Sequence, residues 1–125
     1  MSLPSNKPPM GDVFLAEGTT SIATSPVVAS IVSPVSGILR KVFAASNGTT
    51  TGTITVAVAV NGGSDVTGGQ LKIAAGAGGN NPGLDLPKVG ASTVMVNEGD
   101  VISFTPSGGT GASIPGAFTA VIRPQ

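Results

Sequence analysis

The sequence predicts an all-β protein, an antiparallel β-sandwich of the jelly-roll kind, and three observations lead to this class. Residues 53–60, TITVAVAV, alternate strictly and run into Asn61-Gly62, the pattern of a strand that ends at a hairpin turn. The 19 Gly and 10 Pro would break helices, whereas the abundant Val, Ile and Thr suit pleated strands. No long apolar pattern with a period near 3.6 residues is present, so long amphipathic helices are not expected.

The chain divides into two parts, a Pro-rich arm at residues 1–11 and a sandwich domain at residues 12–125. Proline favours an extended, solvated backbone and cannot nucleate a helix. A disordered tail and an arm that becomes ordered along a neighbouring subunit both fit this composition, and the second is favoured in an assembly protein. The arm residues expected at such an interface are Leu3, Pro4, Pro8, Pro9 and Met10.

The sandwich domain is expected to contain roughly seven to nine short strands, a number suited to two packed sheets. Residues 13–16 and 22–23 read as short strands on either side of a turn at residues 17–20. Residues 97–100 read as a second hairpin turn, and residues 106–116 as a flexible loop. Within residues 38–45 the adjacent Arg40 and Lys41 break the alternation, which requires either a β-bulge or an outer face covered by a partner.

Alternation also predicts which side chains form the core. The four phenylalanines all lie in apolar strands, where core packing is the default. The expected core comprises Ile54, Val56, Val58, Leu71, Ile73, Ile102, Phe104, Phe118 and Ile122.

The opposite face of residues 53–60 carries only small, uncharged side chains, Thr53, Thr55, Ala57 and Ala59. Cover by a second protein and an ordinary Thr/Ala solvent face both fit this pattern. Together with the low overall charge, the face predicts a homo-oligomer, either a dimer or a trimer. The long Gly/Asn/Pro loop at residues 76–88 is a further interface candidate, which Leu84 and Leu86 would tuck against the body.

The composition argues against catalysis and against cofactor or metal binding. Without His or Cys, the chain has no Ser-His or Cys-His pair and no imidazole or thiolate ligand. Its carboxylates lie mostly in turns, where Asp and Glu are common for local backbone reasons. Asn97, Glu98 and Asp100 could offer oxygens to calcium, but a turn explains all three. The Gly-rich runs lack the Lys-Ser/Thr pair of a phosphate loop, and no Trp or Tyr is present to stack on a sugar.

Charge and hydropathy predict no nucleic-acid partner and no membrane partner. The six basic and six acidic residues form no basic stripe. No apolar run approaches the roughly 20 residues that span a bilayer, and the start lacks the pattern of a signal peptide. The chain is therefore expected to be made and used without export.

Two segments carry a resemblance to a known class of protein. GILRKVFAASNGTTTGTITVAVAVNG and VNEGDVISFTPSGGTGASIPGAFTAVIRP together resemble small structural proteins of tailed-phage virions, most closely capsid decoration (cement) proteins of the jelly-roll kind. The resemblance covers roughly residues 37–124 at the level of pattern, with no single signature motif. It implies a protein made in the host cytoplasm, located on the outer capsid surface, that binds the major capsid protein at junctions between subunits and stabilises the shell.

Two other functions compete with this one. A tail-fibre or receptor-binding module could use the same sandwich to present residues 76–88 and 106–116 to a host surface or a carbohydrate. Fibre chains, however, usually include a long shaft, which this sequence lacks. A free-standing binding module or adhesin subunit is the third class, and the missing export signal counts against it.

Overall fold

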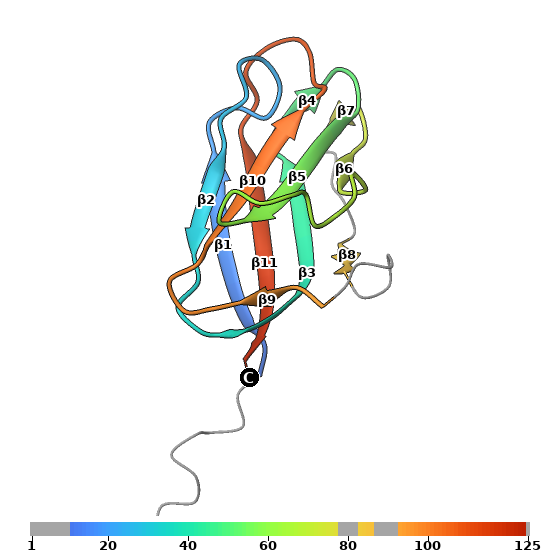
Figure 1. Ribbon diagram of the computed structural model, residues 1–125. Coiled ribbons are helices and arrows are strands. Elements are labelled where there is room, and N and C mark those ends of the chain that lie inside the picture. The colour runs from blue at the N-terminus through green and yellow to red at the C-terminus, as the bar shows by residue number, and fades with distance from the viewer. Residues whose placement is uncertain (1–10, 78–82, 87–92, 125) are drawn as a thin grey trace, which may run out of the picture.

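The computed structural model describes residues 11–77, 83–86 and 93–124, and within them eleven strand segments pair antiparallel (Figure 1). Sheet A contains, in spatial order, β1 (Val13–Thr19), β11 (Gly116–Pro124), β3 (Gly37–Ser46) and β8 (Leu84–Asp85), with β9 (Met95–Val96) also on β3. Sheet B contains β2 (Ala29–Val32), β10 (Val101–Ser107), β5 (Ile54–Val60) and β6 (Lys72–Ile73). β4 (Thr49–Thr50) and β7 (Gly76–Ala77) form a short ribbon.

The two sheets pack face to face, which confirms the predicted antiparallel β-sandwich. In Figure 1, β2, β10 and β5 lie in front of β1, β11 and β3. Val13 pairs with Ile122, so the start of β1 and the end of β11 lie together at one end of the sandwich. Residues 1–10 of the arm lie outside the described residues, and the chain enters the described structure at this end.

The core between the sheets is the one that alternation predicts. All nine expected core residues are buried. Phe104 of β10 and Phe118 of β11 stack with their ring centroids 4.9 Å apart, so an aromatic pair joins sheet B to sheet A. Burial of side chains of this size stabilises a fold by about 1.5–3 kcal/mol each.

The turn at Asn61-Gly62 is confirmed. Both residues have positive φ, 52° and 74°, which is the requirement of a type I′ turn. The Gly63 N–H donates to the Val60 carbonyl at 3.0 Å and closes it. Beyond the turn the chain returns beside β5, where the Val66 N–H donates to the Val58 carbonyl at 2.8 Å, but residues 64–66 form no strand.

The turn at residues 97–100 forms, but the strands on its two sides do not pair, so the expectation of a hairpin there is wrong. The Asp100 N–H donates to the Asn97 carbonyl at 2.9 Å. However, β9 before the turn belongs to sheet A and β10 after it belongs to sheet B. Two further bonds, Gly99 N–H to Ser33 O and Ser33 N–H to Asp100 O, both 2.8 Å, tie the turn to the segment after β2. The turn therefore carries the chain from one sheet to the other.

Two expectations near the N-terminus are also corrected. Residues 17–19 continue β1 instead of turning, because they pair with Phe118, Ala117 and Gly116 of β11. Residues 22–23 are buried in the core yet form no strand. The Ile22 N–H donates to the Ile114 carbonyl at 2.8 Å, and this bond holds the segment in place.

The broken alternation of β3 is explained by a β-bulge. Opposite β11, Val121 pairs with Lys41 while the next residue, Ile122, pairs with Leu39. Arg40 is therefore the extra residue, and Leu39 and Val42 both face the core despite their spacing of three. Gly37, which begins β3, lies so close to the Arg123 carbonyl that a Cβ would clash with it. The strand can approach β11 there only because the residue is glycine.

Candidate protein-docking surfaces

The outer face of sheet B contains most of the described residues that the sequence marks as a candidate interface. Thr55, Ala57 and Ala59 of β5 are partly exposed on it, and Thr53 just before the strand is exposed. Leu84 is partly buried, whereas Leu86 belongs to the core and is not presented to a partner. The candidates of the arm, Leu3, Pro4, Pro8, Pro9 and Met10, lie outside the described residues.

The small, uncharged character of β5 extends across its neighbours in sheet B. Register places Ala59 beside Ser103, Ala57 beside Thr105 and Thr55 beside Ser107. On the far side of β10, Val101 pairs with Val32, whose side chain is 61% exposed. The outward positions of these four strands are Ser30, Val32, Thr55, Ala57, Ala59, Lys72, Val101, Ser103, Thr105 and Ser107, and Lys72 is the one charged residue among them. The sequence marked the β5 part of this face; the β10 and β2 parts became apparent only from the register.

One edge of sheet B is held by a carboxylate. Oδ1 of Asp65 accepts hydrogen bonds from the Thr67 hydroxyl at 2.6 Å, the Thr67 N–H at 2.8 Å and the Val58 N–H at 3.2 Å. Its Oδ2 accepts from the Gly69 N–H at 2.9 Å. Burial disfavours the charged form, but these hydrogen bonds outweigh it and lower the pKa of Asp65 below its ordinary value of 3.8. The carboxylate therefore organises a turn beside β5.

The outer face of sheet A corrects the expectation that all four phenylalanines are core residues. Phe104 and Phe118 are buried, but Phe14 of β1 is 72% exposed and Phe43 of β3 is partly exposed. A uniformly apolar run such as residues 13–16 does not reveal which alternate residues face inward. Pairing with β11 decides this, and it places Phe14 outward.

The pairing of β1, β11 and β3 places the outward residues of sheet A in two rows. Phe14, Val121 and Lys41 pair across β1, β11 and β3, and Ala16, Thr119 and Phe43 form the next row. The Lys41 ammonium lies 5.1 Å from the centroid of the Phe43 ring, within the range of a cation–π contact. Val121 faces outward yet is only 7% exposed. The face is therefore uneven, with aromatic and charged side chains standing around a covered valine.

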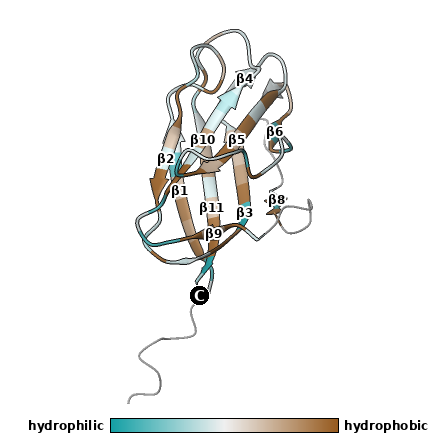
Figure 2. Cartoon of the chain, in the orientation of Figure 1, coloured by the Kyte–Doolittle hydropathy of each residue, from teal (hydrophilic) through white to brown (hydrophobic). Residues whose placement is uncertain are grey.

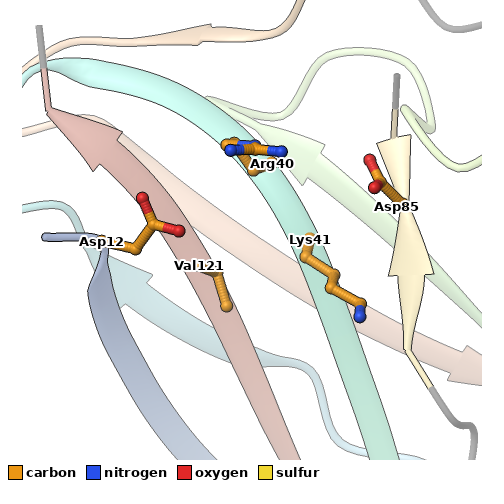
Figure 3. Close-up of a pocket in the computed structure, with 5 residues that line it drawn as sticks. All are labelled: Asp12, Arg40, Lys41, Asp85 and Val121. Atoms are coloured by element: carbon orange, nitrogen blue, oxygen red, sulfur yellow. The ribbon is translucent and has the colours of Figure 1, made fainter. Parts of the chain in front are cut away.

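Charged side chains gather at the end of this face, in a pocket of about 200 Å³ (Figure 3). Asp12, Arg40, Lys41 and Asp85 line it together with Val121, so two acids and two bases share the pocket. Arg123 Nε lies 3.4 Å from Asp12 Oδ1 in an exposed ion pair. Asp85 Oδ1 is buried and has no hydrogen-bond partner among the described residues. Figure 2 likewise shows hydrophilic strand residues near the end of β11 and in the adjoining part of β3.

Asp100, one of the residues considered for calcium binding, serves local structure. Asp100 Oδ2 accepts the Asn97 N–H at 2.8 Å across the turn. Hydrogen bonds with the Asn61 side chain and the Asn97 backbone lower the pKa of Asp100 below 3.8, against the opposing effect of burial. Within residues 11–77, 83–86 and 93–124, no group of three or more His, Cys, Asp or Glu could hold a metal ion.

The loop after β10, expected to be flexible, is anchored to the body. The Thr110 N–H and hydroxyl both donate to the Thr51 carbonyl, at 3.0 and 3.2 Å. The Thr24 hydroxyl donates to the Gly111 carbonyl. Residues 78–82 and 87–88 of the other long loop lie outside the described residues.

The structure is a small β-sandwich whose two outer faces differ in character. No protein-family model, curated protein or solved structure matches the chain. In the described part of the chain, no helix is long and apolar enough to cross a membrane.

Proposed function

We propose that the protein is a structural component of a tailed-phage particle that decorates the capsid by binding at junctions between capsid subunits. The observation that carries the proposal is the outer face of sheet B, where Lys72 is the one charged residue across four strands. A sheet face that remains in water normally carries many charged side chains, and a broad uncharged face is typical of a surface that another protein covers. The sequence resemblance to capsid decoration proteins supports the same role.

The chemistry of the sheet B face suits this role. Side chains such as Ala57, Ser103 and Thr105 lose little conformational entropy when a partner covers them, because few of their bonds rotate. Their small size also lets a second backbone approach closely over β2, β10 and β5. A protein that binds only the closed arrangement of neighbouring subunits stabilises that arrangement by its own binding free energy. Decoration therefore strengthens the shell without any chemical step.

Self-association is part of the proposal. A dimer or trimer would place several copies of the sheet B face around one junction, with cyclic symmetry as the default. Light scattering should then show a dimer or trimer in solution, or the particle should show clustered copies. A monomer in solution together with isolated copies on the virion would remove this part of the proposal.

The test is binding of the full chain to capsids that lack it. Ala57→Lys places a charge in the middle of the sheet B face, and we expect it to weaken binding at least tenfold, about 1.4 kcal/mol. Ser113→Lys makes the same charge change in the exposed loop after β10 and should leave binding unchanged. Equal affinity of the Ala57→Lys and unsubstituted proteins would contradict the proposal.

The arm provides a second measurement. Deleting residues 1–11 removes Leu3 and Met10 together with three prolines, which limit the entropy lost when the segment docks. We expect the sandwich to remain folded and particle binding to fall at least tenfold. If the truncated protein binds capsids with unchanged affinity, the arm takes no part in docking.

A receptor-binding module of a tail fibre is the second candidate, and the exposed residues 110–113 at the loop tip favour it. Copy number separates the two candidates. A decoration protein should occur in hundreds of copies on the head, and a fibre module in tens on the tail. Labelling of purified virions, or a cryo-EM map of the particle, would decide between them.

A further inference from the structure

A groove of about 280 Å³ crosses the outer face of sheet A. None of its residues is among the interface candidates that the sequence indicates. Its walls come from three adjacent strands and the residue that precedes β1. The lining residues are Asp12, Phe14, Lys41, Phe43, Thr119 and Val121. The surface inside is predominantly apolar, and Phe14 at one wall is the most exposed large hydrophobic side chain in the described part of the molecule.

The groove is built to present two aromatic rings. Phe14 on β1 and Phe43 on β3 are separated by the central strand β11, which places these two strands roughly 10 Å apart. The Phe43 ring lies against the Lys41 ammonium, and it packs so close to Gly83 that a Cβ there would lie 2.5 Å from the ring. Val121 and Thr119 form the floor between the rings. Aromatic-lined grooves of this kind are typical binding sites for proline-rich segments in the polyproline II conformation.

The chain itself contains such a segment. Residues 1–10, MSLPSNKPPM, include Pro4, Pro8 and Pro9 and end next to Gly11. Ten residues in the polyproline II conformation extend about 31 Å, long enough to cross from one subunit to another. Proline presents apolar surface, lacks an N–H donor and loses little entropy on docking, which matches an apolar groove.

The position of the arm favours the groove of a neighbouring copy over its own. Asp12, which directly follows the arm, already lines the groove. The residue before a proline is restricted to extended conformations, so Lys7 and Pro8 are not expected to turn the chain back. A return to the same groove would need a complete reversal within Met10 and Gly11, directly beside Phe14.

We propose that residues 1–10 of one copy dock in the Phe14–Phe43 groove of a neighbouring copy, with proline rings between the two aromatic rings. The protein then links to itself by exchange of arms, and the sheet B face stays available for a different partner. This inference concerns the protein alone and requires no capsid.

The test uses the full chain in solution and exploits the absence of Cys. A Leu3→Cys variant with a spin label is mixed with nitrogen-15-labelled copies of the unsubstituted chain. We expect the amide signals of Thr119 and Val121 in the labelled copies to lose intensity, while those of Ser103 and Thr105 on sheet B keep it. Equal broadening of both faces, or none, would overturn the proposal.

Two matched variants of the labelled copy sharpen the test. Phe14→Ser removes one wall of the groove and should abolish the loss of intensity at Thr119. Val32→Ser makes a comparable change to an exposed apolar side chain on the sheet B face and should leave the loss intact. The dispersion of each amide spectrum shows whether the variant is folded. Persistence of the effect in a folded Phe14→Ser protein would place the arm elsewhere.

The source of the arm is tested by the same label. If the Leu3→Cys protein is itself nitrogen-15-labelled, dilution with unlabelled, unsubstituted chain should restore the Thr119 signal, because arms exchange between copies. A loss of intensity that dilution does not relieve would show docking within one chain and overturn the exchange.

Discussion

The outer faces of sheets A and B differ sharply although the inner faces are alike. Both inner faces contribute buried aliphatic side chains to the core. Each also contributes one phenylalanine, and Phe118 of sheet A stacks on Phe104 of sheet B. The outer face of sheet B carries mostly small side chains, and Lys72 is its one charged residue. The outer face of sheet A has exposed aromatic rings and ends in a cluster of acids and bases.

This difference separates two ways of making a protein contact. A face of small Ala, Ser and Thr side chains gains contact area over many residues, none of which dominates the binding energy. A groove between Phe14 and Phe43 concentrates its contact in two large rings, and such aromatic anchors carry most of the energy in typical interfaces. Single substitutions should therefore affect docking strongly on sheet A, whereas on sheet B only the introduction of a charge should do so.

The largest expected effect concerns the aromatic pair that both sheets share. Phe104→Ala or Phe118→Ala should lower the free energy of unfolding by about 3–5 kcal/mol, because each leaves a cavity where the sheets meet. Such a loss is a large fraction of the roughly 5–15 kcal/mol that keeps a domain folded. Urea denaturation followed by circular dichroism measures the change. A loss below about 1 kcal/mol at both positions would show that the stack does not hold the sheets together.

The next effect distinguishes the edge of sheet B from its face. Asp65→Ala removes four hydrogen bonds and should cost about 1–3 kcal/mol, since the N–H groups of Val58 and Thr67 lose their acceptor. Thr105→Ala on the open face serves as the control and should change stability by less than about 0.5 kcal/mol. Equal stability of the Asp65→Ala and Thr105→Ala proteins would show that the turn around Asp65 does not stabilise the fold.

The same carboxylate should make stability depend on pH. The folded-state pKa of Asp65 is lowered below 3.8, so its ionised form stabilises the fold above about pH 4, and this stabilisation is lost as the pH falls through the folded-state pKa. Melting temperatures measured between pH 6 and pH 2.5 should fall less steeply for Asp65→Asn than for the unsubstituted protein. Asp100, whose pKa is lowered in the same direction, should contribute to whatever slope remains. Parallel profiles would contradict the contribution of Asp65.

The smallest effect on stability belongs to Phe14, although it is a large apolar residue. Because its side chain is 72% exposed, Phe14→Ser should change the free energy of unfolding by less than about 0.5 kcal/mol, in contrast to Phe104→Ala. Urea denaturation of the two variants side by side measures the contrast. A loss comparable to that of Phe104→Ala would mean that Phe14 belongs to the core, and the groove on sheet A would then not exist as described.

The sequence by itself determined the class of fold, the inward residues of β5, β10 and β11, and the turns at residues 61–62 and 97–100. These features are local: a period of two separates the faces of an amphipathic strand, and Gly or Asn at positive φ marks a turn. The sequence also marked the small face of β5, because its residues lie next to the core positions in the same strand.

The tertiary structure decided what depends on partners distant in sequence. Pairing with β11 extended β1 through residues 17–19, turned Phe14 outward and created the bulge at Arg40. The turn at residues 97–100 has the same local chemistry whether the next strand stays in its sheet or crosses to the other, so only packing could assign β9 to sheet A and β10 to sheet B. The groove between Phe14 and Phe43 unites residues 29 positions apart across an intervening strand, and neither residue alone distinguishes a wall of a groove from a core side chain. A face of a sheet is a product of register, and register is set by contacts that local sequence patterns do not contain.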